Sequence, residues 1–112
     1  MLTEVQFFIP LTANEDAEGR KNRFPPEHHD AFLLDILAVF DGATFLPGET
    51  DGVWVDRAGK VHRDRCRVLV IGVASVTASG ADLRAVAGRA REWYDQDAIL
   101  FRYLGVSEVY EG

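Results

Sequence analysis

Three residues with metal-binding side chains, His62, Asp64 and Cys66, stand at alternate positions of one stretch of the chain. Alternate side chains of a strand share one face, where neighbours lie about 6–7 Å apart and could converge on a metal ion. His62 and Cys66 would be about 13 Å apart, too far for a Cys–His nucleophile pair. Because a half-buried cysteine on a solvated hairpin arm is the more common arrangement, we expect neither a metal nor another cofactor.

A second group of titratable side chains, Glu27-His28-His29-Asp30, follows two prolines at the start of a predicted helix. Adjacent helical residues point in different directions, so only some of the four could serve one site. The His-Glu-x-x-His spacing of zinc proteases is absent. Histidine titrates nearest neutrality, so His28 and His29 are the best acid–base candidates, with His62 as the third.

Three arginines, Arg63, Arg65 and Arg67, fill the opposite face of the strand that carries His62. A row of guanidinium groups could bind a carboxylate or phosphate bidentately. The same groups could stack on Trp54 or pair with acidic side chains. The acidic surplus favours pairing, with Glu49, Asp51 and Asp56 as the nearest partners. The candidate ligand-binding residues are therefore Trp54, Arg63, Arg65, Arg67 and Tyr103, the two aromatic residues being possible cavity walls.

Composition excludes several functions. The net charge of −6 disfavours binding to nucleic acids or anionic membranes, which need a surplus of lysine and arginine. No P-loop, dinucleotide glycine fingerprint or nucleophile elbow is present. The single cysteine forms no internal disulfide, and the compartment cannot be inferred from it. The N-terminal residues do not resemble a secretory signal and no apolar run is long enough to span a membrane, so we expect a cytoplasmic protein. The excess of arginine over lysine suggests a GC-rich bacterial source.

The stretch from Gly52 to Val73 predicts one long β-hairpin. Asp56 can accept hydrogen bonds within its own turn, and Gly59 supplies the positive φ that a short hairpin loop needs. The Pro47-Gly48 pair breaks the strand before the hairpin, so we expect that strand to be bent or bulged there.

Apolar periodicity predicts the other elements and a single domain over residues 1–112. They are a strand over 5–11, a polar loop over 12–26 expected to be mobile, a helix from Pro25-Pro26 to Phe40, a short strand over 43–46, a helix from about Ser79 to Tyr94, and a strand over 98–104 that could continue to Tyr110. The first helix presents Leu33, Ile36, Leu37 and Phe40 on one face, and the second presents Leu83, Val86, Ala87, Ala90 and Tyr94.

The order βαββαβ indicates an α+β, ferredoxin-like sandwich, with a four-stranded antiparallel sheet and both helices on one face. A sheet covered on one side should alternate apolar and polar residues, yet Val68 to Ile71 is apolar throughout. The face away from the helices is therefore expected to be partly apolar, which marks an interface or a pocket. We expect a homodimer packed through this face, or a ligand cavity on it.

The element order, with Gly52-Val53-Trp54, Gly59 and Arg65-Cys66-Arg67-Val68-Leu69, resembles a small bacterial ferredoxin-like family of unknown function. This resemblance implies a fold and no catalytic role. More loosely, the fold resembles the dimeric α+β-barrel proteins, which include small monooxygenases and isomerases that act in a cavity of the sheet.

Two main functions stay open. The first is a small homo-oligomeric binding module that takes a protein partner or small ligand at the sheet face or the 12–26 loop. The second is a cofactor-independent enzyme of the α+β-barrel type, monooxygenase- or isomerase-like, with Trp54, Tyr103 and an arginine in a cavity and a histidine as acid or base. The net charge alone suggests a third, an acidic phage- or host-encoded protein that blocks a basic partner surface.

Overall fold

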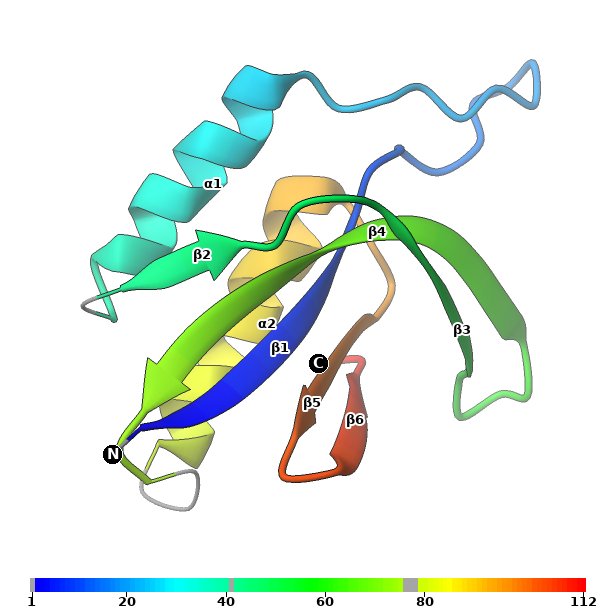
Figure 1. The fold of residues 1–112 in the computed structure, drawn as a ribbon. Helices are drawn as coiled ribbons and strands as arrows, with labels where there is room; N and C mark the ends of the chain where they lie inside the picture. The colour runs from blue at the N-terminus through cyan, green and yellow to red at the C-terminus, as the bar shows by residue number, and fades with distance from the viewer. Residues whose placement is uncertain (1, 41, 76–78) are drawn as a thin grey trace.

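The chain folds into two helices and one antiparallel sheet (Figure 1). The structure, a computed structural model, describes residues 2–40, 42–75 and 79–112. The elements are β1 (Thr3–Pro10), α1 (Pro26–Leu37), β2 (Ala43–Phe45), β3 (Thr50–Val55), β4 (Val61–Val73), α2 (Gly80–Tyr94), β5 (Ile99–Tyr103) and β6 (Val106–Tyr110). Neither helix in the described part of the chain has the length and apolar content needed to cross a membrane.

The α+β class is confirmed, but the four-stranded ferredoxin-like sheet is not, because the described residues form six strands. Their order is β2-β4-β1-β5-β6, and β3 also pairs with β4. The strand expected to bend near Pro47 is two strands, since proline cannot donate a ladder hydrogen bond and Gly48 has a φ of +85°. The last strand doubles back as β6 because Leu104 and Gly105 both have positive φ, as a two-residue hairpin turn requires.

The 13-residue strand β4 joins two parts of the sheet. Its second half pairs with β1, from Cys66 to Val73, and its first half pairs with β3. The β3–β4 turn forms as the sequence predicts. The backbone nitrogen of Lys60 donates to the Asp56 carboxylate at 2.9 Å, and Gly59 has a φ of +83°.

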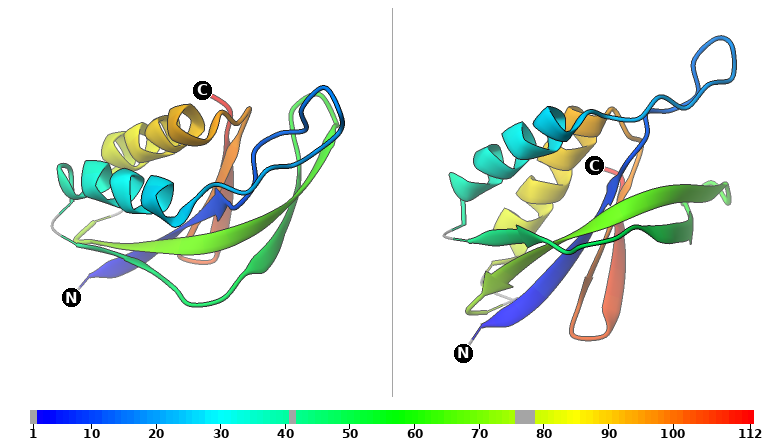
Figure 2. Two further views of the ribbon diagram at one scale, coloured as in Figure 1. Left: turned by 90° about the horizontal axis from the view of Figure 1, so that it is seen from above. Right: turned by 45° about the horizontal axis from the view of Figure 1, so that its top comes forward.

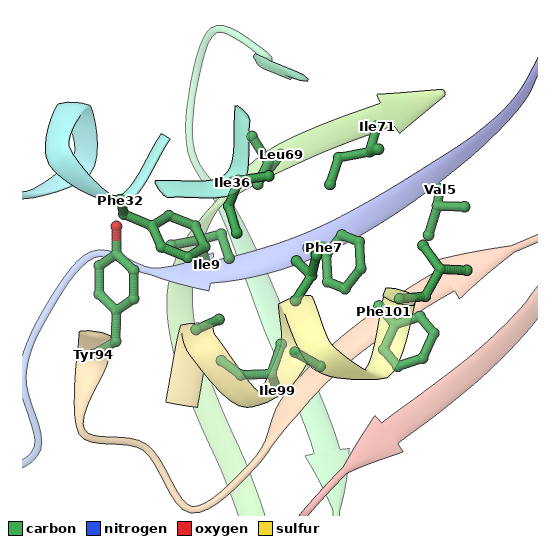
Figure 3. Close-up of a cluster of buried hydrophobic side chains, with 14 of the residues drawn as sticks. Val5, Phe7, Ile9, Phe32, Ile36, Leu69, Ile71, Tyr94, Ile99 and Phe101 are labelled. Carbon is green, nitrogen blue, oxygen red and sulfur yellow. The ribbon is translucent and has the colours of Figure 1, made fainter. Parts of the chain in front are cut away.

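Both helices cover the same face of the sheet (Figure 2), and the main core lies between these layers. The apolar face expected for α2 is confirmed, since all five of its residues are buried. In α1 the buried residues are His29, Phe32 and Ile36, and Leu37 is 41% exposed. Leu33 and Phe40 are half-buried against the core, so of the expected face only Leu37 is exposed, and His29 and Phe32 are buried in addition. Figure 3 shows side chains of β1, β4, β5 and both helices meeting, with Tyr94 at one end of the cluster.

The opposite face of the sheet carries a smaller apolar cluster of Phe8, Trp54, Cys66 and Leu100. Trp54 reaches it from β3, so the β3–β4 hairpin covers part of a face that the sequence leaves apolar. The homodimer expected on this face stays a prediction.

Residues 12–23, which we call the arm, form a narrow hairpin-like excursion after β1 (Figure 1). Thr12 and Arg23 form an isolated antiparallel bridge, and the nitrogen of Ala13 donates to the carbonyl of Asn22 at 2.7 Å. The Asp16 carboxylate accepts hydrogen bonds from the backbone at the tip. The segment therefore has internal hydrogen bonds, and its mobility stays a prediction.

The core assignment predicts that Phe7→Ala lowers the free energy of unfolding by about 3–5 kcal/mol, because Phe7 is fully buried and stacks on Phe101. Leu34→Ala is the control, since Leu34 is 70% exposed and its truncation should change stability by less than about 0.5 kcal/mol. Urea unfolding of both variants measures the difference. Equal losses would contradict the assigned core.

Candidate functional site

A cleft of about 410 Å³ lies where the arm ends, at the start of α1 and beside the β2–β3 connection. Its volume falls in the range of about 300–1,000 Å³ that is usual for small-molecule sites. We call it the α1 cleft. Its lining residues are Leu11, Arg23, Phe24, Pro26, His29, Asp30, Gly48, Glu49 and Arg67. Two sequence candidates, His29 and Arg67, therefore meet in one cavity.

His29 is 6% exposed, and its Nδ1 lies 2.7 Å from the hydroxyl of Tyr94. Burial lowers the pKa of His29, and the charges of His28 and Arg67 lower it further. Burial also raises the pKa of Tyr94, which therefore keeps its proton at neutral pH. We assign the hydroxyl as donor to Nδ1, since no other described group accepts its proton. His29 is then neutral with its proton on Nε2, which has no hydrogen-bond partner in the described residues.

Arg67 enters the cleft from β4 as a half-buried cation. Its guanidinium lies 4.7 Å from the centre of the Phe45 ring and donates to the carbonyl of Leu46 at 3.4 Å. Within the described ranges Arg67 makes no ion pair. Arg65, two residues earlier, pairs with Asp51 at 3.1 Å and with Glu49. Pairing with acidic residues therefore occurs at Arg65 and not at Arg67.

The two carboxylates of the cleft differ in their partners. Glu49 lies 2.6 Å from Arg23 and 3.3 Å from Arg65, and the hydrogen bond from Arg23 is the main reason that its pKa is lowered. Asp30 is exposed and makes neither an ion pair nor a side-chain hydrogen bond to any described residue. The cleft therefore holds one cation, Arg67, and one anion, Asp30, that the described protein groups leave unpaired.

A second cavity of about 500 Å³ lies between the arm, the start of β4 and residues 96–98. Lys21 of the arm lies 3.9 Å from Asp64 of β4. We call this cavity the arm cleft. His62 lines it, but the ring stacks on Trp54 at 5.7 Å and Nε2 lies 2.9 Å from Asp56. That hydrogen bond is the main cause of the lowered pKa of Asp56.

The structure does not bring His62, Asp64 and Cys66 together as a metal site. No group of three or more potential metal-ligand residues (histidine, cysteine, aspartate and glutamate) occurs among the residues described. Cys66 is fully buried against Trp54 and Phe8, and burial raises the pKa of its thiol to about 12. A neutral thiol in the apolar cluster is a packing group.

The other candidates lie apart from the α1 cleft. His28 Nε2 lies 2.7 Å from the carbonyl of Trp93. Trp54 and Tyr103 contact clusters on opposite faces of the sheet and cannot line one cavity. Arg63 is exposed at the arm cleft.

Sequence reasoning missed the aromatic wall at Phe24 and the role of Tyr94. The sequence marks Tyr94 as a core residue of the second helix, which it is. Its contact with His29, 65 positions earlier, depends on the packing of α1 beside α2, so no local pattern in the sequence predicts it.

Comparison with known proteins identifies a shared fold. No family model and no curated protein matches the chain. A phage SAM lyase solved in complex with S-methyl-5′-thioadenosine is 17% identical, with a TM-score of 0.64 over 97% of this chain and 87% of that one. A phage SAM lyase in the apo state is 14% identical, with a TM-score of 0.60 over 96% and 86%.

The burial of His29 predicts a pH effect on stability. Because its pKa is lowered in the folded state, the unfolded chain binds the proton more tightly. The stabilising contribution is complete above the unfolded-state pKa of about 6.5 and is lost as the pH falls toward the folded-state value. Titration followed by NMR should place the His29 pKa below 6.5, and His29→Gln should reduce the loss of stability between about pH 7 and pH 5. A His29 pKa at or above 6.5 would contradict the assigned environment.

Proposed function

We propose that the protein binds S-adenosylmethionine, or a closely related sulfonium nucleoside, in the α1 cleft and cleaves its amino-acid arm without a cofactor. The likeness to phage SAM lyases over nearly the whole chain supports this proposal. The thioadenosine bound in one of those structures is the thioether that remains when a sulfonium nucleoside loses that arm. The proposal develops the cofactor-independent enzyme that the sequence leaves open and replaces its monooxygenase- or isomerase-like chemistry with a lyase reaction.

The observation that carries the proposal is the pair of opposite charges left unpaired in one cleft. Arg67 can hold a carboxylate, and Asp30 can attract an ammonium or sulfonium group. A ligand with both charges fits these two groups better than a neutral or singly charged one. The neutral imidazole of His29 adds a donor, and Phe24 and Leu11 supply apolar wall.

The chemistry suits a cleft without an activated nucleophile. A sulfonium sulfur is a leaving group by itself, because breaking its bond to carbon releases a neutral thioether. The carbon that loses the sulfur gains a bond to an oxygen of the arm's own carboxylate, so the arm leaves as a lactone and the step needs no further reactant. The positive charge on sulfur disappears as that bond breaks, so partial exclusion of water favours the transition state. The residues of the cleft would hold the arm in a reactive conformation and orient it, which is a rate effect of positioning.

Binding without turnover is the second candidate, and the same cleft supports it. The cleft is without an activated nucleophile, since the single cysteine lies in the cluster on the other face of the sheet and the neutral His29 is hydrogen-bonded to Tyr94. A module that only binds a zwitterionic nucleoside would use the same charges. The homo-oligomeric state stays a prediction in either case.

Incubation with S-adenosylmethionine, followed by chromatography and mass spectrometry, tests the function. The protein should produce S-methyl-5′-thioadenosine faster than buffer alone. Asp30→Asn should lower kcat/KM by about 3- to 10-fold, since it removes one charge from the cleft. Asp97→Asn is the matched control, because Asp97 is exposed at the arm cleft, and it should leave the rate unchanged.

Two results separate the candidates. Binding without product would support the binding module. If the protein shows no binding and forms no product, the sulfonium ligand is rejected altogether.

A further inference from the structure

We infer that Arg67 is the residue that recognises the carboxylate of the ligand, and that the α1 cleft therefore selects sulfonium nucleosides that retain an amino-acid arm. This inference rests on the proposed function and names the part of the ligand that determines specificity.

The surroundings of Arg67 fix its guanidinium while leaving donors free. The Phe45 ring covers one face of the group at 4.7 Å, and the Leu46 carbonyl accepts one hydrogen bond at 3.4 Å. Those two contacts leave most of the planar array of N–H donors without a protein acceptor in the described residues. A guanidinium held over an aromatic ring, with its N–H donors free, can bind a carboxylate bidentately.

The neighbouring arginines are already neutralised. Arg23 lies 2.6 Å from Glu49, and Arg65 shares Glu49 and pairs with Asp51. An added carboxylate would have to displace these partners to bind either arginine. At Arg67 the carboxylate would meet a half-buried cation that lacks a counter-charge in the described part of the chain. A half-buried charge without a partner is unfavourable, and pairing with the carboxylate would reduce that free-energy cost.

Other groups around the cleft favour an anion beside Arg67. The charge of Arg67 acts on both neighbours: it adds to the effect of burial in lowering the pKa of His29, and it offsets part of the rise that burial causes in the pKa of Tyr94. Both side chains are neutral at neutral pH, so neither repels a carboxylate. The N-terminal end of α1 also borders the cleft through Pro26 and His29, and its dipole favours negative charge. Asp30 opposes an anion there, but it is exposed to solvent and would face the cationic part of the same ligand.

A functional consequence follows for the end of the reaction. S-Methyl-5′-thioadenosine lacks the amino-acid arm, so it cannot contact Arg67 through a carboxylate. The intact ligand should therefore bind more tightly than the thioether product, and loss of this contact would assist product release.

Isothermal titration with S-adenosylhomocysteine, which keeps the amino-acid arm but has an uncharged sulfur and is not cleaved, and with its decarboxylated form tests the inference on the ligand side, where folding is not affected. Wild-type protein should bind the decarboxylated form about 10- to 100-fold more weakly, because a charge-assisted hydrogen bond is lost. In Arg67→Gln this preference should fall to less than about 3-fold, and Arg67→Lys should retain part of it. Arg63→Gln is the matched control, since it removes the same charge from the exposed part of β4 and should leave the preference unchanged.

Each outcome decides a different claim. Equal affinity of the wild-type protein for the two ligands, or a preference that survives Arg67→Gln, overturns the role of Arg67 and leaves the proposed function in place. If the wild-type protein binds neither of these ligands nor S-methyl-5′-thioadenosine, the proposed function fails and this inference fails with it.

Discussion

The hydrogen bond between His29 and Tyr94 links the two helices at the place where the candidate site forms. His29 lies in the first turn of α1 and Tyr94 is the last residue of α2, and the two polar atoms are 2.7 Å apart in an otherwise apolar layer. Burying either group without a partner would be unfavourable, so each requires the other. The pair holds the start of α1 beside the end of α2 and thereby sets one wall of the α1 cleft.

The long strand β4 supplies the opposite wall and explains why one arginine of three differs from its neighbours. Its side chains alternate between the two faces of the sheet, and its length carries it from the core out to the hairpin. Arg67 lies close to the core, with the centre of the Phe45 ring 4.7 Å from its guanidinium. Arg65 lies two residues nearer the β3–β4 hairpin and pairs with Asp51 at the start of β3. The same strand therefore carries two arginines only two residues apart: Arg65 is paired at the surface, and Arg67 lies unpaired in the cleft.

Sequence alone could predict much of the fold and little of the site. The α2 face and the Asp56–Gly59 turn follow from local periodicity and turn chemistry, and both are confirmed. The sixth strand was missed as a separate element because its turn, Leu104-Gly105, lacks the usual Asn-Gly or Asp-Gly pair. Arg67 and His29 were found as candidates by residue type, but which arginine lacks a carboxylate and which histidine is buried depends on contacts between distant segments.

The most direct test of the site is NMR mapping of amide shifts as S-methyl-5′-thioadenosine is added to the labelled protein. This thioether is the ligand recorded in one of the similar structures, and it tests the place of binding separately from turnover. We predict that the largest changes fall on residues of the α1 cleft, above all on Leu11 and Phe24, the apolar wall that the thioether can contact without an amino-acid arm. Changes centred on the arm cleft or on the face of Trp54 and Leu100, or no changes at all, would contradict it.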